Sequence, residues 1–326
     1  MALVDARLPV PELGVPVELI RAPKGVPRLG WLELGVGPWL ARHPGTLLHG
    51  AAYALPLRLR GPAVVTLYDV AWETHPRDFG PWRRRAWRFS ARRSVAAAGA
   101  VLTVSEFSRQ AIVHSYGVDP STVLVAPSAA GSAFRSGSPP PEPRSLGMSL
   151  PDRYVVALGG AARRDLPLAV EAWRQARAVP GGGARDVGLA VVGSQRPPDD
   201  AGITWLGIVD DPAWVSVLAG ACAFLYPTSH EGFGLPAAEA CACGTPVVCA
   251  KVGSLPEVLG DAAAWAPHRD ATSLAAVLAS LLSDPSLRAR VSAAALARSA
   301  RAPTWDDAAG TTLRAYELAL RRGGLR

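Results

Sequence analysis

Residues 222–250 predict a strand, a glycine loop, a short helix and a second strand. The apolar segment Cys222–Tyr226 predicts the first strand, and the buried run Thr245–Ala250 predicts the second. Pro236 suits the first turn of the helix between them, where a missing N–H costs nothing. Gly244 suits a left-handed residue at the end of that helix. This stretch therefore predicts an α/β fold.

The same alternation of strands and helices continues along the rest of the chain. Strands are expected at Ala63–Leu67, Ala100–Val104, Thr122–Val125, Tyr154–Leu158, Gly188–Val192 and Ile203–Leu206. Helices are expected at Pro81–Ala98, Glu106–Ser115, Leu166–Arg177, Pro212–Ala219, Ser273–Leu282 and Ser286–Ala300. Such alternation predicts parallel, doubly wound sheets.

The sequence also predicts two domains and a linker. Residues 131–151 include Ser-Gly-Ser-Pro-Pro-Pro-Glu-Pro and show no periodicity, which is typical of a linker. We expect an N-terminal domain at 1–135, a linker at 136–151, a C-terminal domain at 152–302 and a final helix within 303–326. The 326 residues are enough for two domains of ordinary size.

Composition limits the class of protein and its compartment. A hydrophobic content of 49% excludes a disordered chain. The chain lacks an apolar run of the roughly 18–20 residues that span a bilayer, and its start lacks a signal-peptide pattern. The four cysteines lie in apolar context without metal-ligand spacing, at positions 222, 241, 243 and 249. They predict buried, reduced thiols and favour a cytoplasmic protein.

The formal charge is +7, and arginine is dense in the helical stretch Trp82–Arg93, where Trp and Phe alternate with the bases. Such a helix suits peripheral contact with an anionic membrane surface, here the inner membrane face, or with an anionic acceptor. The alternative is a solvated helix in an arginine-rich protein. No nucleic-acid partner is expected, because no recognised nucleic-acid motif accompanies the basic residues.

The loop and helix at 231–239 have the chemistry of a sugar-nucleotide site. Gly232 and Gly234 let a ligand approach the main chain closely. The first amides of the following helix lack intrahelical partners and can bind hydroxyls or anionic oxygens. Glu231 lies in the loop and Glu239 in the helix, so the two carboxylates suit a sugar and a ribose on either side of a diphosphate.

These residues resemble the signature of the retaining GT-B glycosyltransferases of family 4. The resemblance rests on Glu231 and Glu239 around Gly-Phe-Gly-Leu-Pro, on Gly-Thr-Pro-Val-Val at 244–248 and on the run Gly253–Ala262. It covers roughly residues 45–322. It implies two Rossmann-like, doubly wound domains facing a cleft, with a C-terminal helix crossing back to the first domain.

The resemblance also implies roles on the donor side. Glu239 is expected to bind the ribose, and Glu231 with the amides of Phe233–Leu235 to hold the sugar. Arg163 and Arg164 are expected to stabilise the diphosphate, because they follow a strand end, where open α/β sheets bind ligands. We therefore predict Glu231, Arg163 and Arg164 as catalytic. The predicted donor-binding residues are Glu239, Gly232, Phe233, Gly234, Leu235, Gly160, Gly207 and Val209. Glu257 recurs in the family and suits either a structural or a ligand role.

The acceptor side is expected to include Tyr68, Asp69, His75 and Ser105. The family commonly has His where this chain has Tyr68, and a phenol with a pKa of about 10 is a poor base near neutral pH. Ser105 is predicted mainly as a helix cap, with a second role near the acceptor or the diphosphate.

The N-terminus departs from the family pattern. Residues 3–7 resemble the first strand and residues 17–22 the next, but Leu8–Glu18 lacks the glycine cluster and a helix of proper length. Either the start codon is misplaced or the acceptor side is reduced.

Two functions follow from these features. The first is a retaining transfer of a hexose from a nucleotide sugar such as GDP-mannose to a glycan, glycolipid, lipid-linked or small-molecule acceptor. Metal and other cofactors are not expected, since no convincing Asp-x-Asp motif occurs. The alternative is a non-catalytic GT-B protein that binds sugar or nucleotide, or supports a partner enzyme. A nicotinamide dehydrogenase is excluded, because neither domain opens with G-x-G-x-x-G after a strand.

Overall fold

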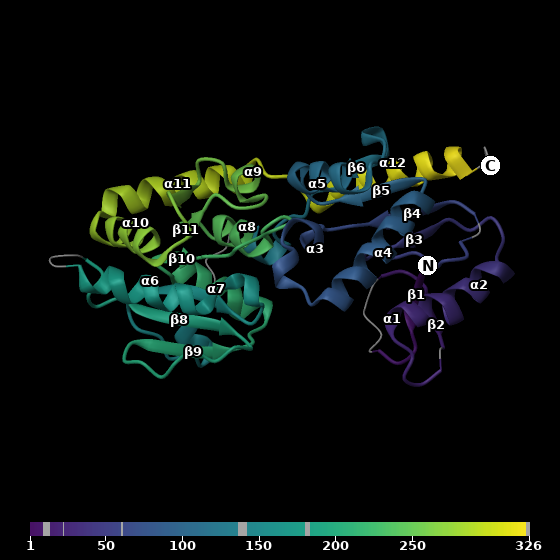
Figure 1. The fold of residues 1–326 in the computed structure, drawn as a ribbon. Helices are drawn as coiled ribbons and strands as arrows, with labels where there is room; N and C mark the ends of the chain where they lie inside the picture. The colour runs from purple at the N-terminus through teal and green to yellow at the C-terminus, as the bar shows by residue number, and fades with distance from the viewer. Residues whose placement is uncertain (9–13, 22, 60, 136–141, 180–182, 324–326) are drawn as a thin grey trace. The chain divides into compact units, whose positions relative to one another are not determined.

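The computed structural model describes residues 1–326 except 9–13, 22, 60, 136–141, 180–182 and 324–326 (Figure 1). The chain divides into two compact units. The first unit consists of Met1–Ala126 and Asp306–Arg326, and the second consists of Pro127–Trp305. The first unit has two sheets and the second has one, and each unit has its own core.

The first unit contains two parallel sheets, one of four strands in the order β3-β4-β5-β6 and one of two strands, β1-β2. The strands are β1 (Ala2–Asp5), β2 (Val17–Ile20), β3 (Leu48–Gly50), β4 (Ala63–Thr66), β5 (Ala100–Thr103) and β6 (Val123–Val125). The helices are α1 (Arg28–Trp31), η1 (Leu32–Val36), α2 (Gly37–Arg42), α3 (Ala71–Thr74), η2 (Pro76–Asp78), α4 (Pro81–Ala97), α5 (Glu106–Tyr116), η3 (Pro120–Thr122) and α12 (Trp305–Gly323).

Helix α5 begins and ends as the sequence predicts. The hydroxyl of Ser105 accepts a hydrogen bond from the Ser108 amide, and Gly117 ends the helix in the left-handed region with φ 65°.

The final helix packs on the first unit. Ala315 and Ala319 of α12 are buried in one cluster with Val64, Ala100 and Leu102. A Cβ at Gly99 would lie 2.6 Å from the Ala319 Cα atom, so the helix approaches the sheet too closely for a larger residue there. The expectation that the last helix returns to the first domain is therefore confirmed.

The second unit contains one parallel sheet of six strands in the order β12-β11-β10-β7-β8-β9. The strands are β7 (Tyr154–Gly159), β8 (Gly188–Gly193), β9 (Ile203–Gly207), β10 (Ala223–Leu225), β11 (Val247–Ala250) and β12 (Ala263–Ala266). The helices are η4 (Ser132–Arg135), η5 (Pro143–Leu146), η6 (Ala162–Arg164), α6 (Leu166–Ala178), α7 (Asp211–Gly220), α8 (Leu235–Ala242), α9 (Leu255–Leu259), α10 (Ala271–Ser283) and α11 (Pro285–Ala300).

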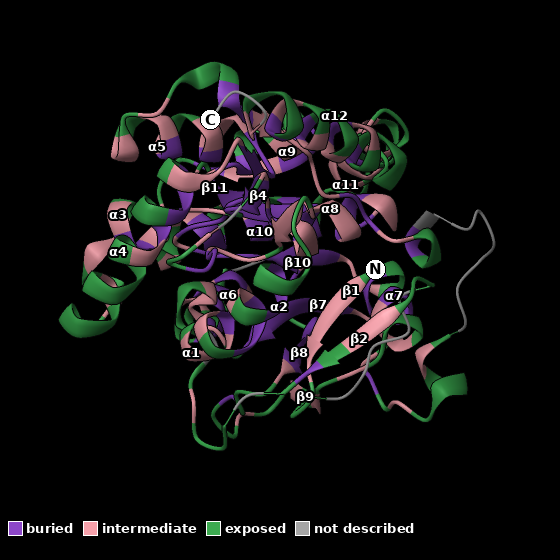
Figure 2. Ribbon diagram, turned by 90° about the vertical axis from the view of Figure 1, so that its right-hand side faces the viewer, coloured by how far each residue is buried: buried purple, intermediate pink, exposed green. Residues whose placement is uncertain are grey.

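Read from β9, the strands follow the doubly wound order three, two, one, four, five, six. The order in which strands are added to the sheet reverses between β7 and β10, and ligands of such sheets bind at the strand ends beside this reversal point. Both faces of the sheet are covered, since alternate residues of β7 enter two different cores. Figure 2 shows this sheet as mostly buried. The predicted α/β class with doubly wound parallel sheets is confirmed.

The boundary between the units differs from the predicted one. Residues 127–135, assigned by the sequence to the first domain, belong to the second unit. The reason is packing: Ala130 and Phe134 are buried in one core with Tyr154 and Val215. Part of the predicted linker is also ordered, because η5 lies within it and Leu150 enters the same core. Residues 136–141 of that linker lie outside the described residues.

The N-terminal region contains elements that the sequence analysis did not assign. Helices α1, η1 and α2 cover residues 28–42, and β3 follows them. The segment Leu8–Glu18 falls partly on residues 9–13, which lie outside the described residues. Within the described part of the chain, no helix is both long enough and apolar enough to cross a lipid bilayer.

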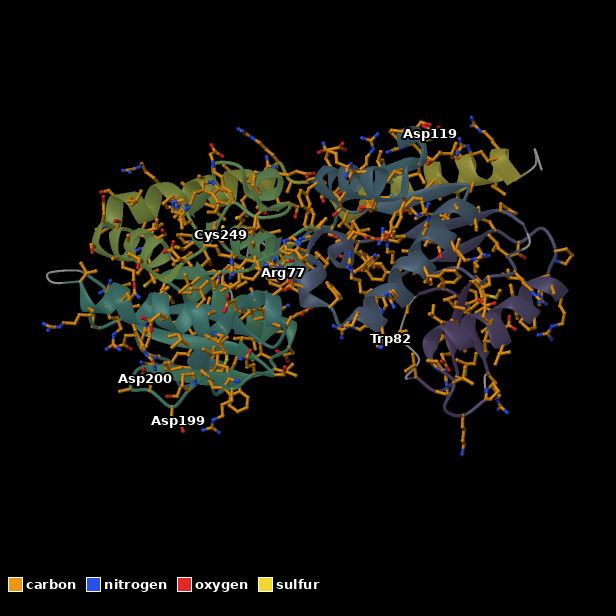
Figure 3. The ribbon with its side chains drawn as sticks, in the orientation of Figure 1. Arg77, Trp82, Asp119, Asp199, Asp200 and Cys249 are labelled. Atoms are coloured by element: carbon orange, nitrogen blue, oxygen red, sulfur yellow. The ribbon has the colours of Figure 1, made fainter. Side chains whose placement is uncertain are left out.

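The four cysteines are free thiols. Cys241 and Cys249 are buried, and the other two are half-buried. Figure 3 labels Cys249 in the second unit. Burial raises the pKa of the Cys241 thiol to about 12, which keeps it protonated and unreactive near neutral pH.

Candidate active site

The candidate site is built from the loops that follow β7 and β10. These two strands are neighbours in the sheet, so the loops at their carboxyl ends meet. The backbone joins them, since the Ser229 amide donates to the Arg163 carbonyl at 2.8 Å. The first loop carries Arg163 and Arg164, and the second carries Glu231.

Glu231 has a buried carboxylate, with 7% of its side chain exposed. Its Oε1 atom accepts a short hydrogen bond from the Tyr226 hydroxyl and a bond of 3.3 Å from the Thr228 hydroxyl. Arg163 Nε lies 3.4 Å from the same oxygen. Burial, followed by the nearby Glu231 charge, raises the pKa of Tyr226, so its phenol stays protonated and donates. The three donors fix Glu231 in one orientation.

The backbone of Glu231 is also fixed. The Ser254 amide and hydroxyl both donate to the Glu231 carbonyl, each at 3.1 Å. Gly253 has φ 54°, and a Cβ there would lie 2.4 Å from the Glu231 carbonyl oxygen. Only glycine fits this approach. The run that begins at Gly253 thus positions the glutamate loop.

Glu239 lies in α8, whose first residue follows Gly234 at φ 90°. The Trp214 indole Nε1 donates to Glu239 Oε2 at 2.9 Å. Burial raises the pKa of Glu239, and the Trp214 bond and the Arg164 charge oppose that rise. The carboxylate is therefore held by one indole and lies within the field of one arginine.

Arg163 and Arg164 end the short helix η6. Arg163 is 44% exposed, so its contact with Glu231 contributes little to stability. Arg164 Nε is buried and has no hydrogen-bond partner among the residues that the structure describes. Its positive charge lowers the pKa of both Tyr226 and Glu239. A buried guanidinium nitrogen without a hydrogen-bond partner suits an anionic ligand.

The turn after the two arginines is also fixed. Asp165 has φ 50°, which is uncommon outside glycine, and its Oδ1 atom caps α6 by accepting from the Leu168 amide at 3.3 Å. Arg269 Nη1 donates to Asp165 Oδ2 at 2.6 Å and to the Pro227 carbonyl at 3.1 Å. Arg269 therefore ties the arginine loop to the glutamate loop.

The other predicted donor residues lie around these loops. Gly160 follows β7, and its amide donates to the Gln195 side chain at 3.4 Å. Gly207 ends β9 rather than following it, and Val209 packs against the core. Gly232 is buried, and Leu235 begins α8.

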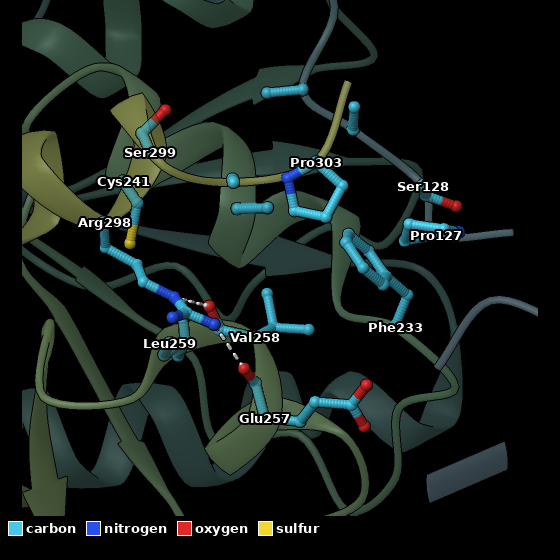
Figure 4. A pocket seen from close by; sticks show the side chains of 14 residues that line it. Pro127, Ser128, Phe233, Cys241, Glu257, Val258, Leu259, Arg298, Ser299 and Pro303 are labelled. Atoms are coloured by element: carbon cyan, nitrogen blue, oxygen red, sulfur yellow. Dashed lines mark hydrogen bonds between the residues drawn. The ribbon is translucent and has the colours of Figure 1, made fainter. Parts of the chain in front are cut away.

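The ring of Phe233 lines a hollow of about 110 Å³ with Pro303 and Arg298 (Figure 4). Its assignment to the donor therefore rests on its backbone amide. At the same hollow, the Glu257 carbonyl accepts from Arg298 Nη2 at 2.6 Å, so the backbone of Glu257 has a structural role.

The predicted acceptor residues belong to the first unit. The Tyr68 hydroxyl donates to the Ala51 carbonyl at 3.0 Å, and Asp69 Oδ1 accepts from the Ala71 amide at 3.0 Å. His75 Nδ1 lies 3.0 Å from the Thr74 hydroxyl. Ser105 is fully buried beneath α5, which supports its role as a cap. An acceptor role for these four residues stays a prediction.

Tyr226, Thr228 and Trp214 hold the two glutamates and were not predicted from the sequence. Tyr226 and Thr228 lie between the strand and Glu231, so their position at the strand end was the available signal. Trp214 lies on α7, 25 residues before Glu239, and no local pattern connects the two.

Comparisons with known proteins agree with the motif. Residues 7–129 match the model of "Glycosyltransferase Family 4", and residues 200–298 match that of "Glycosyl transferases group 1". The chain is 32% identical over 298 residues to O-antigen chain mannosyltransferase B of Escherichia coli, across 83% of this chain and 74% of that protein. The chain belongs to glycosyltransferase family 4.

The chain also resembles a second mannosyltransferase and a solved structure. It is 36% identical over 152 residues to the MMP alpha-(1->4)-mannosyltransferase of Mycolicibacterium hassiacum, across 42% of this chain and 37% of the relative. It shares its fold with Anabaena Alr3699/HepE in complex with UDP and glucose, at a TM-score of 0.69 and 19% identity, across 93% of this chain and 86% of that one. The expected GT-B fold is confirmed.

Proposed function

We propose that the protein is a retaining glycosyltransferase that moves a hexose from a nucleotide-diphosphate sugar to an acceptor. One observation carries the proposal: two carboxylates and two arginines meet at the strand ends beside the reversal point of the second unit. Glu231 and Glu239 supply acceptors for hydroxyl groups, and Arg163 and Arg164 supply the positive charge that a diphosphate needs.

In this proposal Glu239 accepts from the ribose hydroxyls and Glu231 accepts from the hexose. Leu235 is the first residue of α8 and Phe233 lies two residues before it, and unpaired N–H groups and the helix dipole at such a helix start favour negative oxygen. Arg163 and Arg164 stabilise the diphosphate as the bond to the sugar breaks and charge develops on it. The same four groups leave no need for a metal, so metal-independent transfer stays part of the proposal.

GDP-mannose is the proposed donor. The transfer of mannose is supported by the similarity to the mannosyltransferase of Escherichia coli. The Anabaena protein forms a complex with UDP and glucose, so UDP-glucose is the competing donor. The acceptor is proposed to be a glycan or a lipid-linked molecule. The fully formed donor loops argue against the alternative of a non-catalytic binding protein.

Peripheral membrane contact through α4 is part of the same proposal. Trp82 and Phe89 lie seven residues apart, on one side of the helix, and are 80% and 60% exposed. Arg85 lies over the Trp82 ring and Arg93 over the Phe89 ring, at 5.6 and 5.9 Å from the ring centres. Exposed aromatic rings beside arginines suit the surface of an anionic bilayer.

A panel of nucleotide sugars tests the donor proposal. The purified protein is mixed with GDP-mannose, UDP-glucose and their analogues, and its melting temperature is measured. One donor should raise the melting temperature by several degrees, as expected for a ligand far above its Kd. Glu239→Ala should abolish that rise. The proposal fails if no nucleotide sugar stabilises the protein, or if the variant responds like the parent.

A further inference from the structure

The first unit contains a hollow of about 190 Å³ beside α4. Its walls are mostly apolar and come from four parts of the chain: α1, the loop after β3, α3 and α4. The residues that line it are Leu29, Ala52, Tyr53, Ala54, Trp72, Trp87 and Ser90. None of them belongs to the predicted donor or acceptor residues.

Three aromatic rings form the largest part of this wall. The Tyr53 ring centre lies 5.4 Å from that of Trp72 and 5.7 Å from that of Trp87, and the two tryptophans lie 5.2 Å apart. Tyr53 has φ 62°, an uncommon conformation for a bulky residue. Such conformations persist where the surroundings impose them, often at ligand sites. The Tyr53 ring also contacts Tyr68, at 5.6 Å, which connects the hollow to the predicted acceptor side.

The polarity of the wall favours a hydrocarbon over a sugar ring. The Trp72 indole already donates to the Tyr116 hydroxyl at 2.9 Å, and five of the seven lining residues are Ala, Leu or Trp. A buried sugar would leave several hydroxyl groups without partners, at a cost for each. A hydrocarbon has no polar group that would lose a hydrogen bond in this hollow. The hollow exceeds the roughly 150 Å³ of an apolar cavity that binds benzene, so it can hold a chain segment of about six carbons.

Two arginines of α4, Arg83 and Arg84, contact groups next to the residues that line the hollow. Arg83, Trp87 and Ser90 are spaced four and three residues apart, so they share one side of α4. The Arg83 guanidinium lies over the Phe79 ring at 5.5 Å, and that ring neighbours Trp87 at 6.4 Å. Arg84 Nε donates to the Trp72 carbonyl at 2.9 Å, which holds a second positive charge beside the wall. The nearby carboxylate of Glu73, on α3, lies 3.1 Å from Arg88 and is paired with it.

From this combination we propose that the hollow binds a single hydrocarbon chain that carries a phosphate, with the chain against Tyr53, Trp72 and Trp87 and the phosphate at Arg83 and Arg84. The occupant is the lipid end of the acceptor. The inference rests on the proposed function, because it names the class of acceptor for the same transfer. It differs from the membrane contact through Trp82 and Phe89, which lie on another side of α4.

Decyl phosphate, used below its micelle concentration and without any donor, is the test ligand. Its Kd is measured by calorimetry for the parent and for three variants. Ser90→Leu places a larger side chain in the hollow and introduces a better helix former than serine, and should weaken binding by about tenfold or more. Arg83→Ala should weaken it by about tenfold. Arg85→Ala, on the outward side of the same helix, should change it less than about twofold.

Two further ligands separate the competing explanations. Decyl maltoside has the chain without the charge and should bind at least about tenfold more weakly than decyl phosphate. Phosphatidylglycerol vesicles present two-chain lipids in a bilayer, and Ser90→Leu should leave vesicle binding unchanged. The proposal is overturned if Ser90→Leu binds decyl phosphate like the parent, if decyl maltoside binds equally well, or if Ser90→Leu weakens only vesicle binding.

This experiment is separate from the donor test. If a nucleotide sugar stabilises the protein and decyl phosphate does not bind, the acceptor-lipid inference fails and the proposed function stands. If decyl phosphate binds and no nucleotide sugar does, the transferase proposal fails, and with it the assignment of the bound lipid as an acceptor.

Discussion

The bond between Trp214 and Glu239 gives a prediction that depends on pH. Burial raises the pKa of Glu239, and the 2.9 Å bond from the indole is the largest effect opposing that rise. Trp214→Phe removes the donor and keeps an aromatic ring next to Phe224, which the indole contacts edge-on at 6.0 Å. A hydrogen bond to a charged group contributes about 1.5–3 kcal/mol. One pKa unit corresponds to about 1.4 kcal/mol, so the pKa of Glu239 should rise further by about 1–2 units.

The proposed role of the carboxylate determines how donor affinity changes with pH. Ionised Glu239 accepts from the ribose hydroxyls, so donor affinity should fall as the pH drops through the pKa of this group. In Trp214→Phe that fall should begin about 1–2 pH units higher than in the parent. The free energy of unfolding of the variant should also depend on pH. A raised acid pKa contributes stability that is present below the unfolded value and lost as pH rises through the folded value, so the variant should lose more stability at neutral pH than at pH 4.

The assay is the Kd of the stabilising nucleotide sugar, measured between pH 5 and 8.5. A nucleotide sugar is suitable because its diphosphate is esterified at both ends and lacks the terminal phosphate group that titrates near pH 6. Trp265→Phe is the matched control, since it removes an indole bond to a backbone carbonyl, that of Gly260, elsewhere in the second unit. The reasoning is refuted if the Trp214→Phe profile coincides with that of the parent, or if the difference in affinity is the same at every pH.

Two shorter predictions follow from the same structure. Gly253→Ala should lower the free energy of unfolding by about 2 kcal/mol or more, because strain at φ 54° adds to a collision with the Glu231 carbonyl. Gly117→Ala, at φ 65° in open space, should cost only about 1 kcal/mol, and equal losses would contradict the argument. In sedimentation with phosphatidylglycerol vesicles, Arg85→Ala and Arg93→Ala should each weaken binding about fivefold, since a basic residue near an anionic surface contributes about 1 kcal/mol. Unchanged binding, or equal binding to neutral phosphatidylcholine, would refute the membrane contact.

Much of the fold could be predicted because its signals are local. Buried strands such as Ala100–Thr103 are short apolar runs, and Ser105 and Gly117 mark both ends of α5 by their own chemistry. Helices within 28–42 were missed although Leu32, Val36 and Leu40 recur at helical spacing. Glycines at 30, 35 and 37 lower helix propensity there, and the helices form because a small core with Ile20 buries their apolar side.

The candidate site divides in the same way. Glu231, Glu239 and the two arginines lie in loops whose glycines and strand ends are visible in the sequence. Their partners depend on tertiary structure, since Trp214 reaches Glu239 from another helix and Arg269 reaches Asp165 across 104 residues. The predicted domain boundary differs from the observed one for a related reason, because the burial of Phe134 depends on a core formed by later strands.

The most direct test of the central claim is the anomeric configuration of the sugar released from the stabilising donor, followed by proton NMR during slow hydrolysis. The first sugar released should have the donor's own anomeric configuration. Arg164→Ala should release sugar at least about a hundredfold more slowly, because a group that stabilises the developing charge is lost. Release of the opposite anomer, or an unchanged rate in Arg164→Ala, would contradict retaining transfer at this site.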